Sequence, residues 1–115
     1  MIVELVTFKA PKGADWDAIL ADARATIPRW RADPALLRKH YLLSEDGQDC
    51  AGLYVWPTRA AAEKAHDAAW LAGVEKRTGQ APSIQYFQLQ MLLDNEAGTV
   101  TEWSNDGIAH LRPAS

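Results

Sequence analysis

The residue best suited to acid–base chemistry is His66, which lies in an alanine-rich stretch with helical periodicity. It shares one predicted helix face with Ala62, Ala65, Ala69 and Trp70, so its imidazole is expected to point toward a sheet. An imidazole with a pKa of about 6.5 can accept a phenolic proton at neutral pH. We therefore take His66 as the candidate catalytic base. The alternative is a core histidine whose ring nitrogens bond only to the backbone or to a tyrosine.

Five further side chains are candidates for the wall of a substrate pocket. Tyr54 and Trp56 share one face of a predicted strand, and Trp70 follows the candidate base by one helical turn. Tyr86, on a later strand, offers a further hydroxyl donor, and His40 lies on an earlier strand. Buried aromatic residues more often pack than bind, and charged strand residues usually face solvent. Core packing or a solvated edge is thus the alternative for each.

Other chemistries find little support in the sequence. The only cysteine, Cys50, forms no intrachain disulfide, and the three histidines are spaced 26 and 44 residues apart. This spacing does not match a zinc site, and the scattered glycines form no phosphate-binding loop. We predict no metal ligands and no nucleotide.

Charge and hydropathy exclude several classes of partner. The net charge of −3 offers no basic stripe to neutralise phosphates, so a nucleic-acid-binding role is not expected. No apolar run approaches the roughly 20 residues of a membrane span, and no signal peptide precedes the first strand. We therefore expect a cytoplasmic protein with no membrane partner.

The elements that must position these residues follow from hydrophobic periodicity. One domain is expected in a chain of 115 residues. Four strands are predicted, over residues 2–9, 36–44, 50–56 and 83–93. One helix is predicted from Trp16 to Trp30, interrupted near Pro28, and a second starts at Thr58 and runs past Trp70. Residues 1–93 make the domain, and residues 94–115 are a polar C-terminal extension.

The predicted order is βαββαβ, which is typical of an α+β, ferredoxin-like fold with a four-stranded antiparallel sheet. Both helices cover one face of that sheet. Strand 50–56 is apolar on both faces, because Leu53 and Val55 alternate with Tyr54 and Trp56. We therefore predict a homodimer in which a second copy covers the open face.

This combination resembles the antibiotic-biosynthesis monooxygenase superfamily, the dimeric α/β barrels, and within it the YdhR-like group. The likeness covers roughly residues 1–93 and rests on Pro34, Leu37, Lys39, Tyr41, Ser44, Glu45, Gly52, Tyr54 and Trp56. It implies a small hydrophobic pocket between sheet and helices. It also implies a cofactor-independent monooxygenase, without metal, flavin or haem. The substrate would be a small aromatic or polyketide-like molecule, with His66 as the base.

Two other functions remain open at this point. One is a haem-binding or haem-degrading protein, although Thr7 stands where that branch of the superfamily has an asparagine. The other is a non-catalytic dimeric module for small ligands. Five tryptophans could fill the pocket of such a module.

Overall fold

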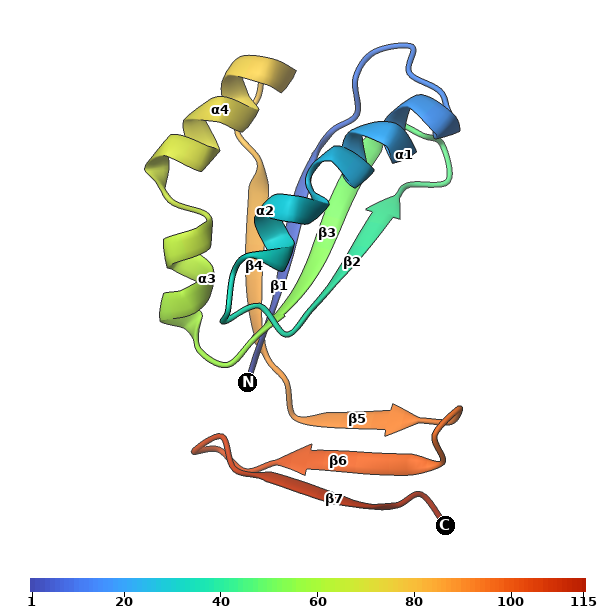
Figure 1. The fold of residues 1–115 in the computed structure, drawn as a ribbon, viewed down its shortest axis with the longest axis vertical. Helices are drawn as coiled ribbons and strands as arrows, with labels where there is room; N and C mark the ends of the chain where they lie inside the picture. The colour runs from blue at the N-terminus through green and yellow to red at the C-terminus, as the bar shows by residue number, and fades with distance from the viewer.

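The computed structural model describes all 115 residues, Met1–Ser115. Its main layer is an antiparallel sheet in the spatial order β2–β3–β1–β4, built from β1 (Ile2–Lys9), β2 (Arg38–Leu43), β3 (Asp49–Trp56) and β4 (Ser83–Gln88). One face of this sheet carries the helices α1 (Trp16–Ala25), α2 (Ile27–Arg31), α3 (Arg59–Ala65) and α4 (Ala68–Thr78) (Figure 1). The predicted α+β, ferredoxin-like fold is confirmed.

Local signals explain where the helices begin. The Asp15 carboxylate accepts a hydrogen bond from the Ala18 amide at the start of α1, and the Thr58 hydroxyl caps α3 in the same way. Pro28 lies in the first turn of α2, where a missing N–H costs nothing, and so separates α2 from α1.

The second predicted helix is two helices. It breaks at His66, whose backbone leaves the helical region at φ −106° and ψ 59°, and restarts with Asp67 as a new N-cap. The Asp67 carboxylate accepts from the amide of Trp70 at 2.9 Å. His66 therefore lies at a helix junction and not on a continuous helix face.

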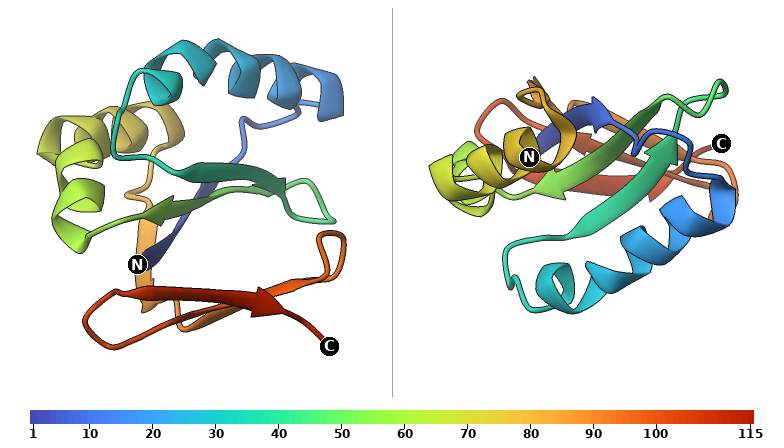
Figure 2. Two further views of the ribbon diagram at one scale, coloured as in Figure 1. Left: turned by 60° about the horizontal axis from the view of Figure 1, so that its bottom comes forward. Right: turned by 90° about the horizontal axis from the view of Figure 1, so that it is seen from above.

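The predicted strand over residues 83–93 also divides in two. β4 ends at Gln88, and β5 (Met91–Asp94) joins β6 (Thr99–Trp103) and β7 (Ala109–Pro113) in a second antiparallel sheet. The amide of Leu89 still bonds to the carbonyl of Met1 at 2.9 Å, so the chain leaves the main sheet only after Leu89. This small sheet lies beyond the end of the main sheet where β1 begins (Figures 1 and 2). Half of the residues predicted as a polar tail are thus strand.

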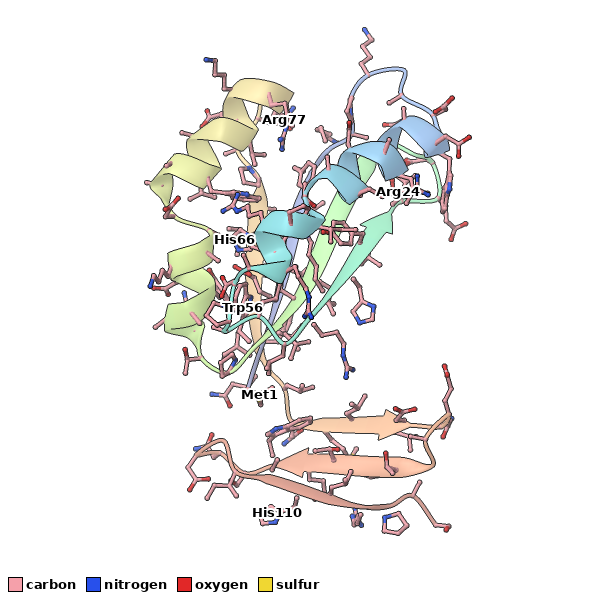
Figure 3. The ribbon with its side chains drawn as sticks, in the orientation of Figure 1. Met1, Arg24, Trp56, His66, Arg77 and His110 are labelled. Carbon is pink, nitrogen blue, oxygen red and sulfur yellow. The ribbon has the colours of Figure 1, made fainter.

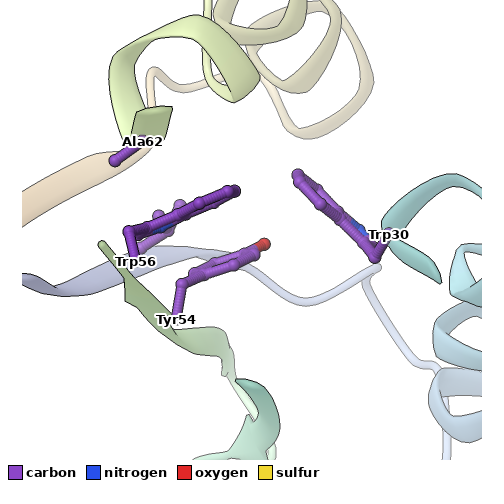
Figure 4. Packing of buried hydrophobic residues seen from close by; sticks show 5 residues of the cluster. Trp30, Tyr54, Trp56 and Ala62 are labelled. Atoms are coloured by element: carbon purple, nitrogen blue, oxygen red, sulfur yellow. The ribbon is translucent and has the colours of Figure 1, made fainter. Parts of the chain in front are cut away.

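The two faces of the main sheet differ in how they are covered. The helix-covered face contains the core cluster of Val6, Trp30, Tyr54, Trp56 and Ala62 (Figure 4). The opposite face is also apolar, with Val3, Leu5, Leu53 and Val55 half-buried and Phe87 exposed. None of the helices is long and apolar enough to cross a bilayer.

Candidate functional site

A row of polar side chains crosses the helix-covered face of the sheet, one from each strand. The strand register places Lys39 of β2 opposite Tyr54 of β3, Tyr54 opposite Glu4 of β1, and Glu4 opposite Tyr86 of β4. Neighbouring strands lie about 4.8 Å apart, so these side chains are direct neighbours. The row brings a cation, a carboxylate and two phenols under the helices.

Glu4 is the centre of this row, and it is fully buried. Its Oε1 accepts a hydrogen bond from Trp56 Nε1 at 2.9 Å, and its carboxylate lies 2.9 Å from Nδ1 of His66. An indole N–H can only donate, so the carboxyl group must accept there. Burial of a carboxylate is tolerated because both of its oxygens have partners.

His66 projects from the junction of α3 and α4 toward the sheet (Figure 3). The Glu4 carboxylate favours a proton on Nδ1, so the neutral imidazole keeps its lone pair on Nε2. That Nε2 atom is buried and has no hydrogen-bond partner. Four aromatic rings enclose the imidazole, with centroids 4.4 Å away for Trp70, 4.7 Å for Tyr54, 5.2 Å for Trp30 and 6.3 Å for Trp56.

A cavity of about 850 Å³ lies beside this network. Its walls come from the end of β1 and the segment after it, and from α1, α2, β2, β3 and α4, and they are mainly apolar. Trp30, Tyr54 and Trp70 belong both to this wall and to the cage around His66. One layer of aromatic side chains therefore separates the cavity from the buried imidazole.

Two polar groups of the cavity wall have perturbed acidities. Burial, followed by the charge of Arg29, lowers the pKa of Lys39 to about 7. Burial, followed by the charge of Glu4, raises the pKa of Tyr54 well above its usual value. At neutral pH, Tyr54 is therefore a hydrogen-bond donor, and Lys39 exchanges its proton readily.

Several solved structures share this architecture, although no family model and no curated protein matches the sequence. A monooxygenase from the gene ActVA-Orf6 of Streptomyces coelicolor, in complex with nanaomycin D, is 18% identical with a TM-score of 0.60 over 77% of this chain and 87% of that one. SnoaB, a cofactor-independent oxygenase from Streptomyces nogalater, is 18% identical with a TM-score of 0.57, covering 80% and 95%. A protein described as an antibiotic biosynthesis monooxygenase is 16% identical with a TM-score of 0.58, covering 77% and 98%. The chain has the antibiotic-biosynthesis monooxygenase fold. At these identities the likeness establishes the fold alone.

Within this fold, the residues predicted from sequence occupy different places. Tyr54 and Trp70 line the cavity. Trp56 is fully buried and stacks on Tyr54. Tyr86 lies outside the cavity wall, and burial, followed by the charge of Glu4, raises the pKa of its phenol to about 12. His40 is exposed and alternates with Lys39 and Tyr41, so it lies on the opposite face of the sheet from the cavity.

The fold brings two further residues to this site, Glu4 and Lys39, which were not predicted as site residues from the sequence. The sequence pattern of residues 2–9 predicts a strand but assigns no role to Glu4, and Lys39 enters the prediction only among the residues that carry the resemblance. A carboxylate on an apolar face of a strand is a usable signal of a buried polar site, because a buried carboxylate must have a hydrogen-bonding or charged partner. Thr7, by contrast, lies three residues from Glu4 and so on the other face of β1 from His66.

Accessibility to diethylpyrocarbonate should distinguish the three histidines. His40 and His110 are exposed, whereas the His66 side chain is fully buried. We expect His40 and His110 to be modified at least tenfold faster than His66, as followed by peptide mass spectrometry. In Trp70→Ala, which opens the layer between cavity and imidazole, modification of His66 should accelerate. Equal rates for all three in the wild type would contradict the enclosed imidazole.

Gly52 allows the Tyr54 ring to lie along the strand. A Cβ at position 52 would come within 2.7 Å of Cε1 of that ring. Gly52→Ala is therefore expected to displace Tyr54 and to lower the free energy of unfolding by about 1–3 kcal/mol. Gly73→Ala is the matched control, because a Cβ there meets nothing within 4 Å and alanine favours the helix. Urea unfolding of both variants measures the difference, and equal stability would contradict the close contact.

Proposed function

We propose that the protein is a cofactor-independent monooxygenase that oxidises a small aromatic or polyketide-like molecule with dioxygen. One observation carries the proposal. A carboxylate-held imidazole with a free Nε2 lies one aromatic layer from a largely apolar cavity of about 850 Å³. Support also comes from two structures of similar fold, one named a cofactor-independent oxygenase and one a monooxygenase in complex with nanaomycin D.

The site offers the groups that such a reaction needs. A base removes a proton from a phenol or anthrone, and the resulting anion transfers an electron to dioxygen. For an anthrone, the methylene becomes a carbonyl that contains one oxygen atom, and the second oxygen leaves as water. The four electrons come from the substrate, so no external reductant is required. We assign the base to His66 and its orientation to Glu4. Tyr54 donates a hydrogen bond to developing oxyanion charge.

For His66 to act as the base, substrate in the cavity must reach its Nε2 atom. Trp70 is half-buried, lines the cavity, and packs against His66 with ring centroids 4.4 Å apart. Substrate can reach Nε2 only when the layer of Trp30, Tyr54 and Trp70 opens, and of these three side chains Trp70 lies nearest to the imidazole. This aromatic layer therefore controls access to the base in the proposed reaction.

Oxygen uptake tests the proposal directly. The protein is supplied with a panel of anthrones, hydroquinones and naphthols without added cofactor, and the wild type is compared with His66→Ala. His110→Ala is the matched control, because this histidine lies on β7, far from the site (Figure 3). We expect uptake by the wild type and by His110→Ala, and at least a tenfold loss in His66→Ala. Equal uptake by all three proteins would remove His66 as the base.

The second candidate function is a non-catalytic module that binds small ligands in the same cavity. The enclosure of His66 by four aromatic rings favours it, because the resting structure keeps the imidazole away from the cavity. Saturable ligand binding without oxygen uptake across the panel would favour the module over the oxygenase.

We further propose that the protein is most similar to the YdhR-like monooxygenases and that it acts as a homodimer whose two main sheets face each other. The helix-free face of the main sheet supports this, since it combines half-buried aliphatic side chains with an exposed Phe87. Size-exclusion chromatography with light scattering should give twice the chain mass at micromolar concentration. A monomer at that concentration would overturn the proposed dimer.

A further inference from the structure

We infer that the cavity takes an aromatic substrate bearing an anionic group, and that Lys39 binds this group. The inference deepens the proposed function, on which it rests, by naming the class of substrate. It also assigns a specificity-determining role to a residue of the cavity wall outside the Glu4–His66 pair.

The first support is the charge of the cavity wall. The protein as a whole is acidic, with a net charge of −3. The wall nevertheless contains a single acidic residue, Asp22, and five basic ones, which are Lys9, Lys12, Arg29, Lys39 and Arg77. Positive charge is therefore concentrated at the cavity, and a concave site with walls of one sign attracts ligands of the opposite sign.

The second support is that Lys39 and Arg29 lack a carboxylate partner. Four ion pairs occur in the structure, and neither residue takes part in them. Of the other wall cations, Lys9 is neutralised by Asp49 at 3.0 Å. Arg29 and Lys39 both lie over the Trp30 ring, and the charge of Arg29 disfavours the ammonium form of Lys39. An anion bound between them would supply the missing counter-charge.

The third support is the fixed position of the Lys39 ammonium. Its Nζ lies over three aromatic rings, 4.0 Å from the centroid of Tyr41, 4.5 Å from Trp30 and 4.7 Å from Tyr54. These rings hold the ammonium by cation–π attraction at the cavity wall. The Tyr54 oxygen is directed toward Trp30 (Figure 4), and both side chains line the cavity together with Lys39. An anion bound to Lys39 would therefore lie next to the aromatic layer that covers His66.

The titratable groups around Lys39 determine how many protons are taken up when an anion binds. They are Arg29 from α2, Tyr41 from β2 and Tyr54 from β3, while Glu4 in the next strand is engaged by His66 and Trp56. With a pKa of about 7, most Lys39 side chains are neutral at pH 8. A bound anion favours the ammonium form, so binding at pH 8 should take up close to one proton.

Isothermal titration calorimetry of the full chain tests the inference, with 1-naphthoate as the anionic probe and 1-naphthamide as its neutral isostere. We expect the wild type to bind the naphthoate at least tenfold more tightly, and Lys39→Met to lose this preference while still binding the amide. Lys64→Met, an exposed lysine outside the cavity, is the control with the same change in charge. Titrations at pH 8 in buffers of different ionisation enthalpy measure the proton uptake, which Lys39→Met should abolish.

Three results would overturn the inference: no binding of naphthoate, equal binding of the two probes by the wild type, or an unchanged preference in Lys39→Met. These measurements need no turnover, so they separate the two proposals. Naphthoate binding that depends on Lys39, without oxygen uptake on any substrate, would retain the anion site and reject the oxygenase. Oxygen uptake without a preference for the anion would retain the oxygenase and reject the anion site.

Discussion

Replacing Glu4 by alanine is expected to lower the free energy of unfolding by about 3–5 kcal/mol. The carboxylate is fully buried and is the hydrogen-bond partner of both Trp56 Nε1 and His66 Nδ1. Its removal leaves two buried donors without acceptors and opens a void under the helices. Urea unfolding followed by circular dichroism measures the change.

The matched control is Glu63→Ala on the exposed side of α3. Glu63 pairs with Arg59 at 2.8 Å, with both side chains largely exposed to solvent. Exposed helix pairs of this kind contribute about 0.5 kcal/mol or less. Losses of similar size in the two variants would contradict the structural role of Glu4.

Glu4→Gln separates the effect of Glu4 on stability from its effect on His66. A glutamine has nearly the same shape, and its carbonyl can still accept from Trp56. Its amide N–H₂ then faces Nδ1, which must become the acceptor, so the imidazole proton moves to Nε2. Most of the stability should remain, but oxygen uptake should fall about as far as in His66→Ala. Full uptake in Glu4→Gln would show that the tautomer of His66 does not matter for turnover.

The order of elements could be predicted because each depends on local signals. Asp15 and Thr58 cap their helices, Pro28 separates α1 from α2, and β3 shows its alternation directly in the sequence. These features depend on residues a few positions apart. The antiparallel sheet then follows from the βαββαβ order.

The breaks in the chain were missed because the apolar pattern continues through them. Helical spacing runs unbroken from Ala62 to Trp70, and only Asp67 marks the new N-cap between them. The alternation in residues 84–93 likewise continues across Leu89, with no glycine or proline to mark the turn. The signals for the last two strands were present. Gly98 and Gly107 adopt positive φ values in the turns that flank the β-branched strand β6.

The candidate site itself was only partly predictable, because its key pairing is long-range. His66 and Tyr54 could be selected from residue type and face. The partner of His66 is 62 positions away in the sequence, and only the sheet register and the helix junction bring Glu4 beneath it. The position of the cavity, beside the imidazole and not around it, depends on how Trp30 and Trp70 pack.

The second large loss of stability is expected when Trp56 is replaced by alanine, with Trp16→Ala as the control. Trp56 is fully buried, whereas Trp16 is 67% exposed. The Trp56 indole stacks on Tyr54, with centroids 5.9 Å apart and planes at 13°, and packs beneath Ala62 (Figure 4). Trp56→Ala should lower the free energy of unfolding by about 3–5 kcal/mol, because truncating a buried indole leaves a cavity. Trp16→Ala should change it by about 0.5 kcal/mol or less.

Trp56→Phe divides the effect of the indole into packing and hydrogen bonding. Phenylalanine keeps most of the ring but removes the N–H that Glu4 Oε1 accepts, which should cost about 1–3 kcal/mol. If that bond holds Glu4 in place, the losses in Trp56→Phe and Glu4→Ala should not add in the double variant, because both break one network. Losses that add fully would mean that Trp56 stabilises the core by packing alone. Glu4 would then be positioned by His66 without help from the indole.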